Sequence, residues 1–381
     1  MQSQPTWILR HHSPDSIHSL RAIKTQDEGA FVLAGDASGR VSLTSLEDYR
    51  PRCFWSPHTK SILGIDVVQG QQGKSACVIS QGRDNKLLAS LLPSPSLAPS
   101  GAAVLPSRIQ SDLPVPMLLD SLDINALNFC PFACVPARDG RNGGYLVAVP
   151  HTVDSAFVDL YSLPSKQRVV RALGKADIES ERSALGHRKG IVMSMSLHRT
   201  KDKLRLVAGY EDGYVKSWAI DEKAEEKEWS WDLLWSERKH IESVLALAVS
   251  ADHTFAVSVG ADDRLVRYEL VDGRSTVIKC KSSGHASVVV RQDGCLVAVG
   301  GWDGRIRLYD AALELKDTLR YHKDTVQVLA FLEARKDLRI FHRGQQDDSD
   351  DDEDQESSHR YDAGLLVSGG KDGRVCLWKT L

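Results

Sequence analysis

The stretch Leu366-Val-Ser-Gly-Gly-Lys-Asp-Gly-Arg-Val-Cys-Leu-Trp378 decides the fold, because its pattern recurs along the 381-residue chain. The pattern is an apolar strand, a glycine, a tight turn with Asp-Gly, and an alternating strand that ends in an aromatic residue. Two further clear copies are Leu206-Val-Ala-Gly-Tyr-Glu-Asp-Gly-Tyr-Val-Lys-Ser-Trp218 and Val297-Ala-Val-Gly-Gly-Trp-Asp-Gly-Arg-Ile-Arg-Leu-Tyr309. Asp-Gly between alternating strands favours a two-residue hairpin turn, since such turns need residues with φ > 0.

Four weaker copies bring the number of repeats to seven. They run from Phe31 to Thr44, Cys77 to Ser90, Tyr145 to Tyr161 and Phe255 to Tyr268. One small sheet cannot bury its apolar face alone, so neighbouring sheets have to stack. We therefore predict an all-β fold in which residues 1–381 form one domain, a seven-bladed β-propeller.

The last repeat ends after three strands, which leaves one sheet incomplete. The N-terminal segment Trp7-Ile8-Leu9-Arg10 precedes the first full repeat. A strand from this segment would complete the last sheet and remove two open sheet edges. We expect the ring to be closed in this way by the N-terminal strand.

Three segments interrupt the repeats. Residues 221–235 begin charged and end Trp229-Ser-Trp-Asp-Leu-Leu-Trp235, which indicates either an outer strand with aromatic packing or an exposed aromatic docking patch. Residues 91–118 carry six prolines with several serines, which is typical of a loop that leaves the second blade. Residues 343–360 form an acidic insert in the last blade, and within it 346–356 hold eight of the 51 acidic residues. Like charges keep such a segment from packing, so it is either a solubilising loop or a contact for a basic partner. Ser349 stands between aspartates and is a candidate phosphosite, where phosphate would add negative charge.

Composition excludes several classes of protein. The net charge is −3, but outside 346–356 there are 48 basic and 43 acidic residues, a balance too small to indicate nucleic-acid binding. No apolar run approaches the roughly 20 residues of a membrane span, and Met1 to Arg21 does not read as a secretory signal. The seven cysteines are read as reduced thiols, and Cys130 and Cys134 have no second pair at metal-ligand spacing.

A histidine precedes the first strand of most repeats, and this arrangement resembles the WD-repeat family. In that family a histidine, a strand serine or threonine, the turn aspartate and the aromatic residue form a buried hydrogen-bonded set. The resemblance carries this set onto the matching residues of three repeats: His187, Asp212 and Trp218; His285, Asp303 and Tyr309; and His322, Ser368, Asp372 and Trp378. Histidines also precede the second and fifth blades, as His58 and His240, and the turns of these blades carry Asp84 and Asp262. Thr44 and Ser90 replace the aromatic residue in the first two blades.

No catalytic, phosphate-binding or metal motif stands out, and no cofactor or small-molecule substrate is expected. The His/Ser/Asp sets resemble a hydrolase triad, but their recurrence beside an aromatic residue suits a structural brace. Function is then expected at the surface. The residues before the turn aspartates, Arg83, Glu211, Trp302 and Lys371, are candidate protein contacts. Trp302 leads, because an exposed tryptophan often anchors an interface, although it could instead fold over its own blade.

Several strings are similar to the fungal ASTRA-associated WD-repeat proteins, whose animal counterpart is the G-protein β-subunit-like protein. They are Ser80-Gln-Gly-Arg-Asp84, Leu146-Val-Ala-Val-Pro150, Leu206-Val-Ala-Gly-Tyr-Glu-Asp-Gly213 and Gly301-Trp-Asp-Gly-Arg-Ile-Arg307. The resemblance implies a nuclear, non-catalytic scaffold of the ASTRA complex with Tel2/Tti-type protein partners, with the cytoplasm as a second location. It links the chain to chromatin remodelling and to maturation of phosphatidylinositol-3-kinase-related kinases. The alternative is a cytoplasmic G-protein β-like signalling adaptor, which would carry an N-terminal coiled-coil helix.

Overall fold

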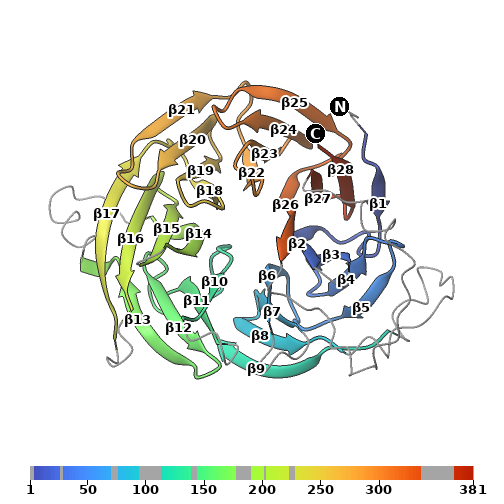
Figure 1. Cartoon of the computed structure of the whole chain (residues 1–381), viewed down its shortest axis with the longest axis horizontal. Coiled ribbons are helices and arrows are strands. Elements are labelled where there is room, and N and C mark those ends of the chain that lie inside the picture. The colour runs from blue at the N-terminus through green and yellow to red at the C-terminus, as the bar shows by residue number, and fades with distance from the viewer. Residues whose placement is uncertain are drawn as a thin grey trace, which may run out of the picture.

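The computed structural model describes residues 4–25, 29–69, 76–93, 113–138, 144–176, 190–200, 203–222, 228–335 and 364–380. The regular elements of these ranges are β-strands, β1 to β28. Figure 1 shows small sheets set side by side around a ring. The architecture is all-β and consistent with a β-propeller, as the repeats predict.

Five sheets in the described ranges contain four antiparallel strands each. The first two consist of β6 (Ile62–Val68), β7 (Cys77–Gly82), β8 (Lys86–Leu91) and β9 (Met117–Asp123), and of β10 (Ala133–Pro136), β11 (Tyr145–Pro150), β12 (Val158–Leu163) and β13 (Gln167–Leu173). The third consists of β14 (Val192–Arg199), β15 (Leu204–Tyr210), β16 (Tyr214–Asp221) and β17 (Ser230–Arg238). The last two consist of β18 (Val244–Val249), β19 (Phe255–Gly260), β20 (Arg264–Glu269) and β21 (Ser275–Lys279), and of β22 (His285–Val290), β23 (Leu296–Gly301), β24 (Arg305–Asp310) and β25 (Leu315–Arg320).

A sixth sheet joins the two ends of the chain. Its order is β1-β28-β27-β26-β2-β3-β4-β5. These strands are β1 (Trp7–Leu9), β28 (Val375–Lys379), β27 (Leu365–Gly370), β26 (Val326–Arg335), β2 (Ile17–Thr25), β3 (Ala30–Asp36), β4 (Val41–Ser45) and β5 (Pro51–Trp55). β1 pairs antiparallel with β28 over Trp7 to Leu9, and β2 pairs parallel with β26. The N-terminal strand therefore lies beside the last strand of the chain, and both termini lie together in Figure 1.

The cores lie between neighbouring sheets. Every residue of β7, β11, β19, β23 and β27 is buried, so these second strands are covered on both faces. One cluster combines Ile79 of β7 with Val147 of β11, and another combines Leu308 of β24 with Leu366 of β27. Because neighbouring sheets cover both faces of these second strands, their sequences are nearly continuous apolar runs rather than strictly alternating ones.

The turns of the repeats are longer than predicted. Residues 211–213 and 302–304 form three-residue connections between the second and third strands of their sheets. Within these two turns only the glycines have positive φ, 86° at Gly213 and 72° at Gly304. A two-residue hairpin turn of type I′ needs two residues with positive φ, whereas a three-residue turn needs only one. The glycine is thus required, but the prediction of two-residue turns was wrong.

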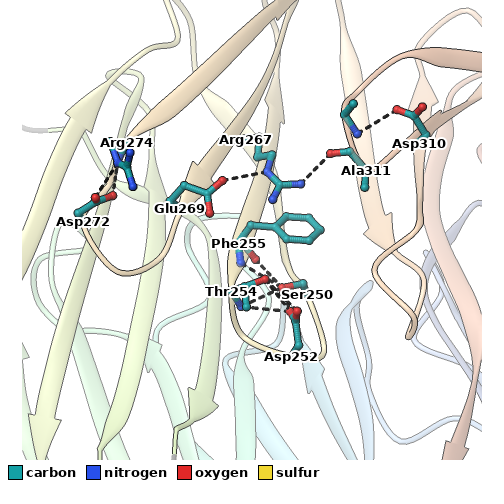
Figure 2. Close-up of polar contacts among 11 residues, drawn as sticks. Ser250, Asp252, Thr254, Phe255, Arg267, Glu269, Asp272, Arg274, Asp310 and Ala311 are labelled. Carbon is teal, nitrogen blue, oxygen red and sulfur yellow. Dashed lines mark hydrogen bonds and ion pairs between the residues drawn. The ribbon is translucent and has the colours of Figure 1, made fainter.

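Polar contacts also join adjacent sheets, as Figure 2 shows for β20 and the turn after β24. The Arg267 guanidinium lies 3.9 Å from the centre of the Phe255 ring and donates a 2.7 Å hydrogen bond to the carbonyl of Ala311. At the start of β19, the Asp252 carboxylate accepts hydrogen bonds from the Ser250 hydroxyl and from both the amide and the hydroxyl of Thr254. These contacts fix the connection that leads into the strand.

The proline-rich segment and the acidic insert fall between strands. Of residues 91–118, Leu91 ends β8 and Met117 begins β9, while 94–112 lie outside the described residues. The acidic insert 343–360, with Ser349, also lies outside them.

Candidate protein-interaction face

A hydrogen-bonded set braces the sheet that contains β26, β27 and β28. His322 Nδ1 lies 3.0 Å from Asp372 Oδ1, and His322 Nε2 lies 2.8 Å from the Ser368 hydroxyl. Trp378 Nε1 donates to the same hydroxyl at 2.8 Å. The four residues come from the connection before β26, from β27, from the following turn and from β28. They therefore tie the outer part of the sheet to its inner strand.

The proton positions in this brace follow from the acids and bases present. Burial alone would raise the pKa of Asp372, but the hydrogen bond from His322 and those from the backbone amides of Lys323 and Arg374 hold that pKa below its usual value. An ionised carboxylate only accepts, so His322 carries its proton on Nδ1. Its Nε2 then accepts from the Ser368 hydroxyl, whose oxygen in turn accepts from the indole of Trp378. The brace is a directed chain of hydrogen bonds.

The same arrangement recurs in two other sheets. His240 Nδ1 lies 3.0 Å from Asp262 Oδ1, and its Nε2 lies 2.7 Å from the Ser258 hydroxyl. His58 contacts Asp84 at 2.9 Å and the Ser80 hydroxyl at 3.0 Å. The sequence pattern locates both histidines and both turn aspartates, although the contact sets carried over from the family omit them.

The part of the eight-stranded sheet formed by β2 to β5 uses a displaced version of the brace. His12 Nδ1 lies 2.8 Å from Asp36 Oδ2, and His12 Nε2 lies 2.8 Å from the Ser42 hydroxyl. Asp36 lies two positions before the turn residue Ser38, and Ser42 belongs to the third strand rather than the second. Sequence reasoning missed His12 for this reason, since it assigned the segment around Trp7 only to ring closure.

One predicted set is not hydrogen-bonded as expected. The Asp303 carboxylate pairs with Arg307, whose Nη2 lies 2.6 Å from Asp303 Oδ2 and whose Nη1 lies 3.2 Å from Oδ1. His285 is buried but is not bonded to Asp303, and Val299 stands where the brace needs a hydroxyl. The Tyr309 hydroxyl contacts the Cys280 thiol at 3.6 Å instead. Arg307 thus binds the Asp303 carboxylate in place of His285. The prediction that His285, Asp303 and Tyr309 form one hydrogen-bonded set was wrong.

The remaining predicted set is seen only in part, because His187 lies outside the described residues. The Asp212 carboxylate accepts from the amides of Gly190 and Tyr214, and Trp218 is fully buried. In the braces that are complete, the serine and histidine side chains are buried. A substrate carbonyl could not reach a serine hydroxyl in such a place, so the resemblance to a hydrolase triad is one of residue types only.

The candidate contacts lie at one end of the strands, which we call the rim face. It carries the connections within the sheets, 83–85, 151–157, 211–213, 261–263, 302–304 and 371–374, and the connections between sheets, 56–61, 124–132, 239–243, 280–284 and 321–325. Arg83, Glu211 and Lys371 are exposed there. Lys371 Nζ lies 3.8 Å from Asp324 Oδ2, and a Glu211 oxygen lies 3.5 Å from the amide nitrogen of Ile191.

Trp302 is partly exposed, as an interface anchor would be, and is also packed against its own blade. Its side chain is half exposed, with 50% of its area accessible. The ring also lies so close over Gly284 that a Cβ atom there would come within 2.3 Å of it, and Gly284 has a φ of +80°. Gly284, in a backbone conformation that favours glycine, therefore lies directly beneath the indole ring of Trp302. The ring is held in place on the rim face while one side remains accessible.

Exposed apolar side chains occur on the rim face, as they also do on the outer strands β9, β17, β21 and β25. Within the described residues, those on rim connections are Leu127, Phe129, Val153, Ile241 and Trp302. The opposite face, by contrast, carries Val271 in the turn after β20. Apolar side chains that remain in water on one face are typical of a protein-interaction surface.

Other features of the described residues offer less. A cavity of about 390 Å³ is lined by His198, His253, Gln292 and Glu333 among others. No cluster of three or more metal-ligating side chains occurs in the part of the chain that the structure describes. In that same part, no helix is long and apolar enough to cross a membrane. None of the cysteines in those ranges forms a disulfide.

Comparison with known proteins identifies the family. The WD40 family, described as WD domain, G-beta repeat, matches residues 278–310. ASTRA-associated protein 1 of Verticillium alfalfae is 31% identical to this chain over 98% of its length and 92% of the relative's. This chain belongs to the ASTRA-associated protein 1 family. Members from Schizosaccharomyces japonicus and Schizosaccharomyces pombe are each 28% identical over 98% of both chains. The printed names of these relatives describe them as ASTRA-associated.

Proposed function

We propose that this chain is a non-catalytic scaffold subunit of the ASTRA assembly and that it binds Tel2/Tti-type proteins through its rim face. The observation that carries the proposal is the end-to-end similarity to proteins named ASTRA-associated protein 1, at 31% identity for one of them. The exposed apolar side chains of the rim face support a role in binding proteins. The proposal includes residence in the nucleus and a role in chromatin remodelling and kinase maturation.

The proposed scaffold is a closed ring of seven blades. If the eight-stranded sheet is divided between β2 and β26, the described strands form seven units of four. The pairing of β1 with β28 supports closure, because one strand from the start of the chain then completes the last unit. A closed ring leaves each blade packed on both sides, which suits a rigid platform for several partners.

The test is purification of the tagged full-length chain from native cells, with co-eluting proteins identified by mass spectrometry. Recovery of Tel2-like and Tti-like proteins at stoichiometric amounts is expected. Recovery of a Gγ-like subunit in their place would favour the cytoplasmic signalling adaptor. Fractionation of the same cells tests the location, and a chain absent from nuclei would contradict that part of the proposal.

A further inference from the structure

Three strongly exposed apolar side chains lie on the rim face where the sheet of β6 to β9 meets the sheet of β10 to β13. The accessible fractions are 79% for Leu127, 58% for Phe129 and 88% for Val153. Leu127 and Phe129 belong to the connection 124–132, and Val153 belongs to the connection 151–157. We call these three residues together with Arg83 the apolar patch.

Buried amide side chains hold the connection 124–132 in place. Asn125 Nδ2 donates to the carbonyl of His151 at 2.9 Å and to the Ser155 hydroxyl at 3.0 Å. Asn128 Nδ2 donates to the carbonyl of Val192 at 2.6 Å. These bonds join the two connections of the patch to each other and to the next sheet.

The same connection is bound to the sheet on its other side. Gln81, fully buried in β7, accepts from the Phe132 amide at 2.7 Å and donates to the carbonyl of Cys130 at 3.3 Å. The amide of Ile124 donates to the carbonyl of Asn85 at 2.9 Å. Buried amides are stable only when they are hydrogen-bonded, so the backbone beneath Leu127 and Phe129 is fixed. Its apolar side chains are exposed by a rigid scaffold, and a fixed surface loses less entropy when a partner binds.

Arg83 gives the patch a charge preference. Its guanidinium carbon lies 4.3 Å from the centre of the Phe129 ring, within cation–π distance. Within the described residues, no carboxylate forms an ion pair with Arg83. A guanidinium offers a planar edge of N–H groups that matches the two oxygens of a carboxylate. At its Arg83 end the patch therefore complements an apolar group with a carboxylate beside it, whereas the exposed Asp154 next to Val153 disfavours a carboxylate at the other end.

We propose that the apolar patch docks a segment of a partner protein in which a bulky apolar side chain lies within a few residues of an aspartate or glutamate. The apolar side chain covers Leu127, Phe129 and Val153, and the carboxylate pairs with Arg83. This inference rests on the proposed scaffold function and names a site within it. The patch lies on different sheets from Trp302, so the two can engage different segments.

The first test selects peptides from a random phage-displayed library on the purified full-length chain. The expected peptides share an apolar residue close to Asp or Glu. Arg83→Glu and Phe129→Ala are each expected to weaken peptide binding at least about tenfold. Arg83→Lys should weaken it by less, because an ammonium keeps the positive charge although it lacks the bidentate edge. All these positions are exposed, and an unchanged melting temperature shows that each variant is folded. The matched control is Val271→Ser, which removes an exposed apolar side chain from the opposite face and should bind as the parent does.

Failure to enrich such peptides, or equal binding by the patch variants and the parent, overturns the proposal. The second test repeats the purification from cells with Phe129→Ala and Val271→Ser. Loss of a partner from Phe129→Ala alone supports the docking site. If ASTRA subunits are recovered equally with both variants, the docking site is overturned while the scaffold function stands. If the parent chain itself recovers no ASTRA subunits, the scaffold function is contradicted. The peptide selection alone then tests the docking site.

Discussion

Removal of one hydroxyl from the brace of the last sheet should destabilise the protein far more than removal of an equally buried hydroxyl elsewhere. Ser368 and Ser217 are both fully buried strand serines. The Ser368 hydroxyl has two partners at 2.8 Å, His322 Nε2 and Trp378 Nε1. Within the described part of the chain the Ser217 hydroxyl has none. The two serines thus differ in their hydrogen bonds rather than in their burial.

The expected magnitudes follow from the groups left behind. Ser368→Ala leaves the indole N–H and the imidazole nitrogen buried without a partner, and each such group costs about 1–3 kcal/mol, so a loss of roughly 2–4 kcal/mol is expected. Ser217→Ala removes a hydroxyl that is already unsatisfied, so the change should lie between zero and a gain of about 1 kcal/mol. Ser258→Ala should fall between them, because its contact to Tyr268 is long, at 3.4 Å, while its bond to His240 is short.

The assay is urea unfolding of the three variants and the parent chain, followed by both tryptophan fluorescence and circular dichroism. Coincident curves from the two probes justify conversion of midpoints into free energies. Hydrogen exchange then locates the effect, since Ser368→Ala should speed exchange in β27 and β28 before other strands. Equal losses for Ser368→Ala and Ser217→Ala, or a larger loss for Ser217→Ala, would refute the idea that the hydrogen bonds of the brace stabilise the sheet.

Four further predictions test other parts of the molecule. Deletion of residues 1–10 removes β1 and exposes the edge of β28, so we expect an aggregating or poorly folded chain; a soluble product with unchanged melting would contradict closure. Burial, with help from His253 and Arg205, lowers the pKa of His198 to about 3, so the unfolded chain binds a proton below pH 6.5 that the folded chain does not. Stability should then fall as the pH drops from 6.5 toward 4, and His198→Phe should flatten this fall by about 1 kcal/mol per pH unit in urea titrations, whereas an unchanged slope would count against it. Trp302→Ala should weaken partner recovery at constant melting temperature, and undiminished recovery would exclude Trp302 as an anchor. Phosphopeptide mapping from cells should find phosphate on Ser349, a prediction abandoned if that peptide is covered and never modified.

The repeat pattern was sufficient for the strands and for the positions of the turns, though not for the length of the turns, because the causes of strands and turns are local. Apolar runs, turn glycines and the aromatic residue at the strand end are close in sequence, and each restricts the backbone near itself. The brace of His322, Ser368, Asp372 and Trp378 followed from the resemblance to the WD-repeat family rather than from spacing, because the acidic insert separates His322 from Ser368 in the sequence. The exposed patch around Phe129 was missed, because the segment 124–132 contains no repeat signal and its apolar residues resemble those of a strand.

The sequence by itself determined the all-β repeat architecture, the positions of the turns and the family, because these depend on short-range pattern and on similarity along the chain. Only the tertiary structure decided which aspartate each buried group binds. Arg307 displaces His285 from Asp303, and His12 reaches Asp36 from a segment that precedes the first sheet. The choice between such partners depends on distances across strands and sheets, and on the cost of leaving a buried charge unpaired. Spacing along the chain does not encode either quantity.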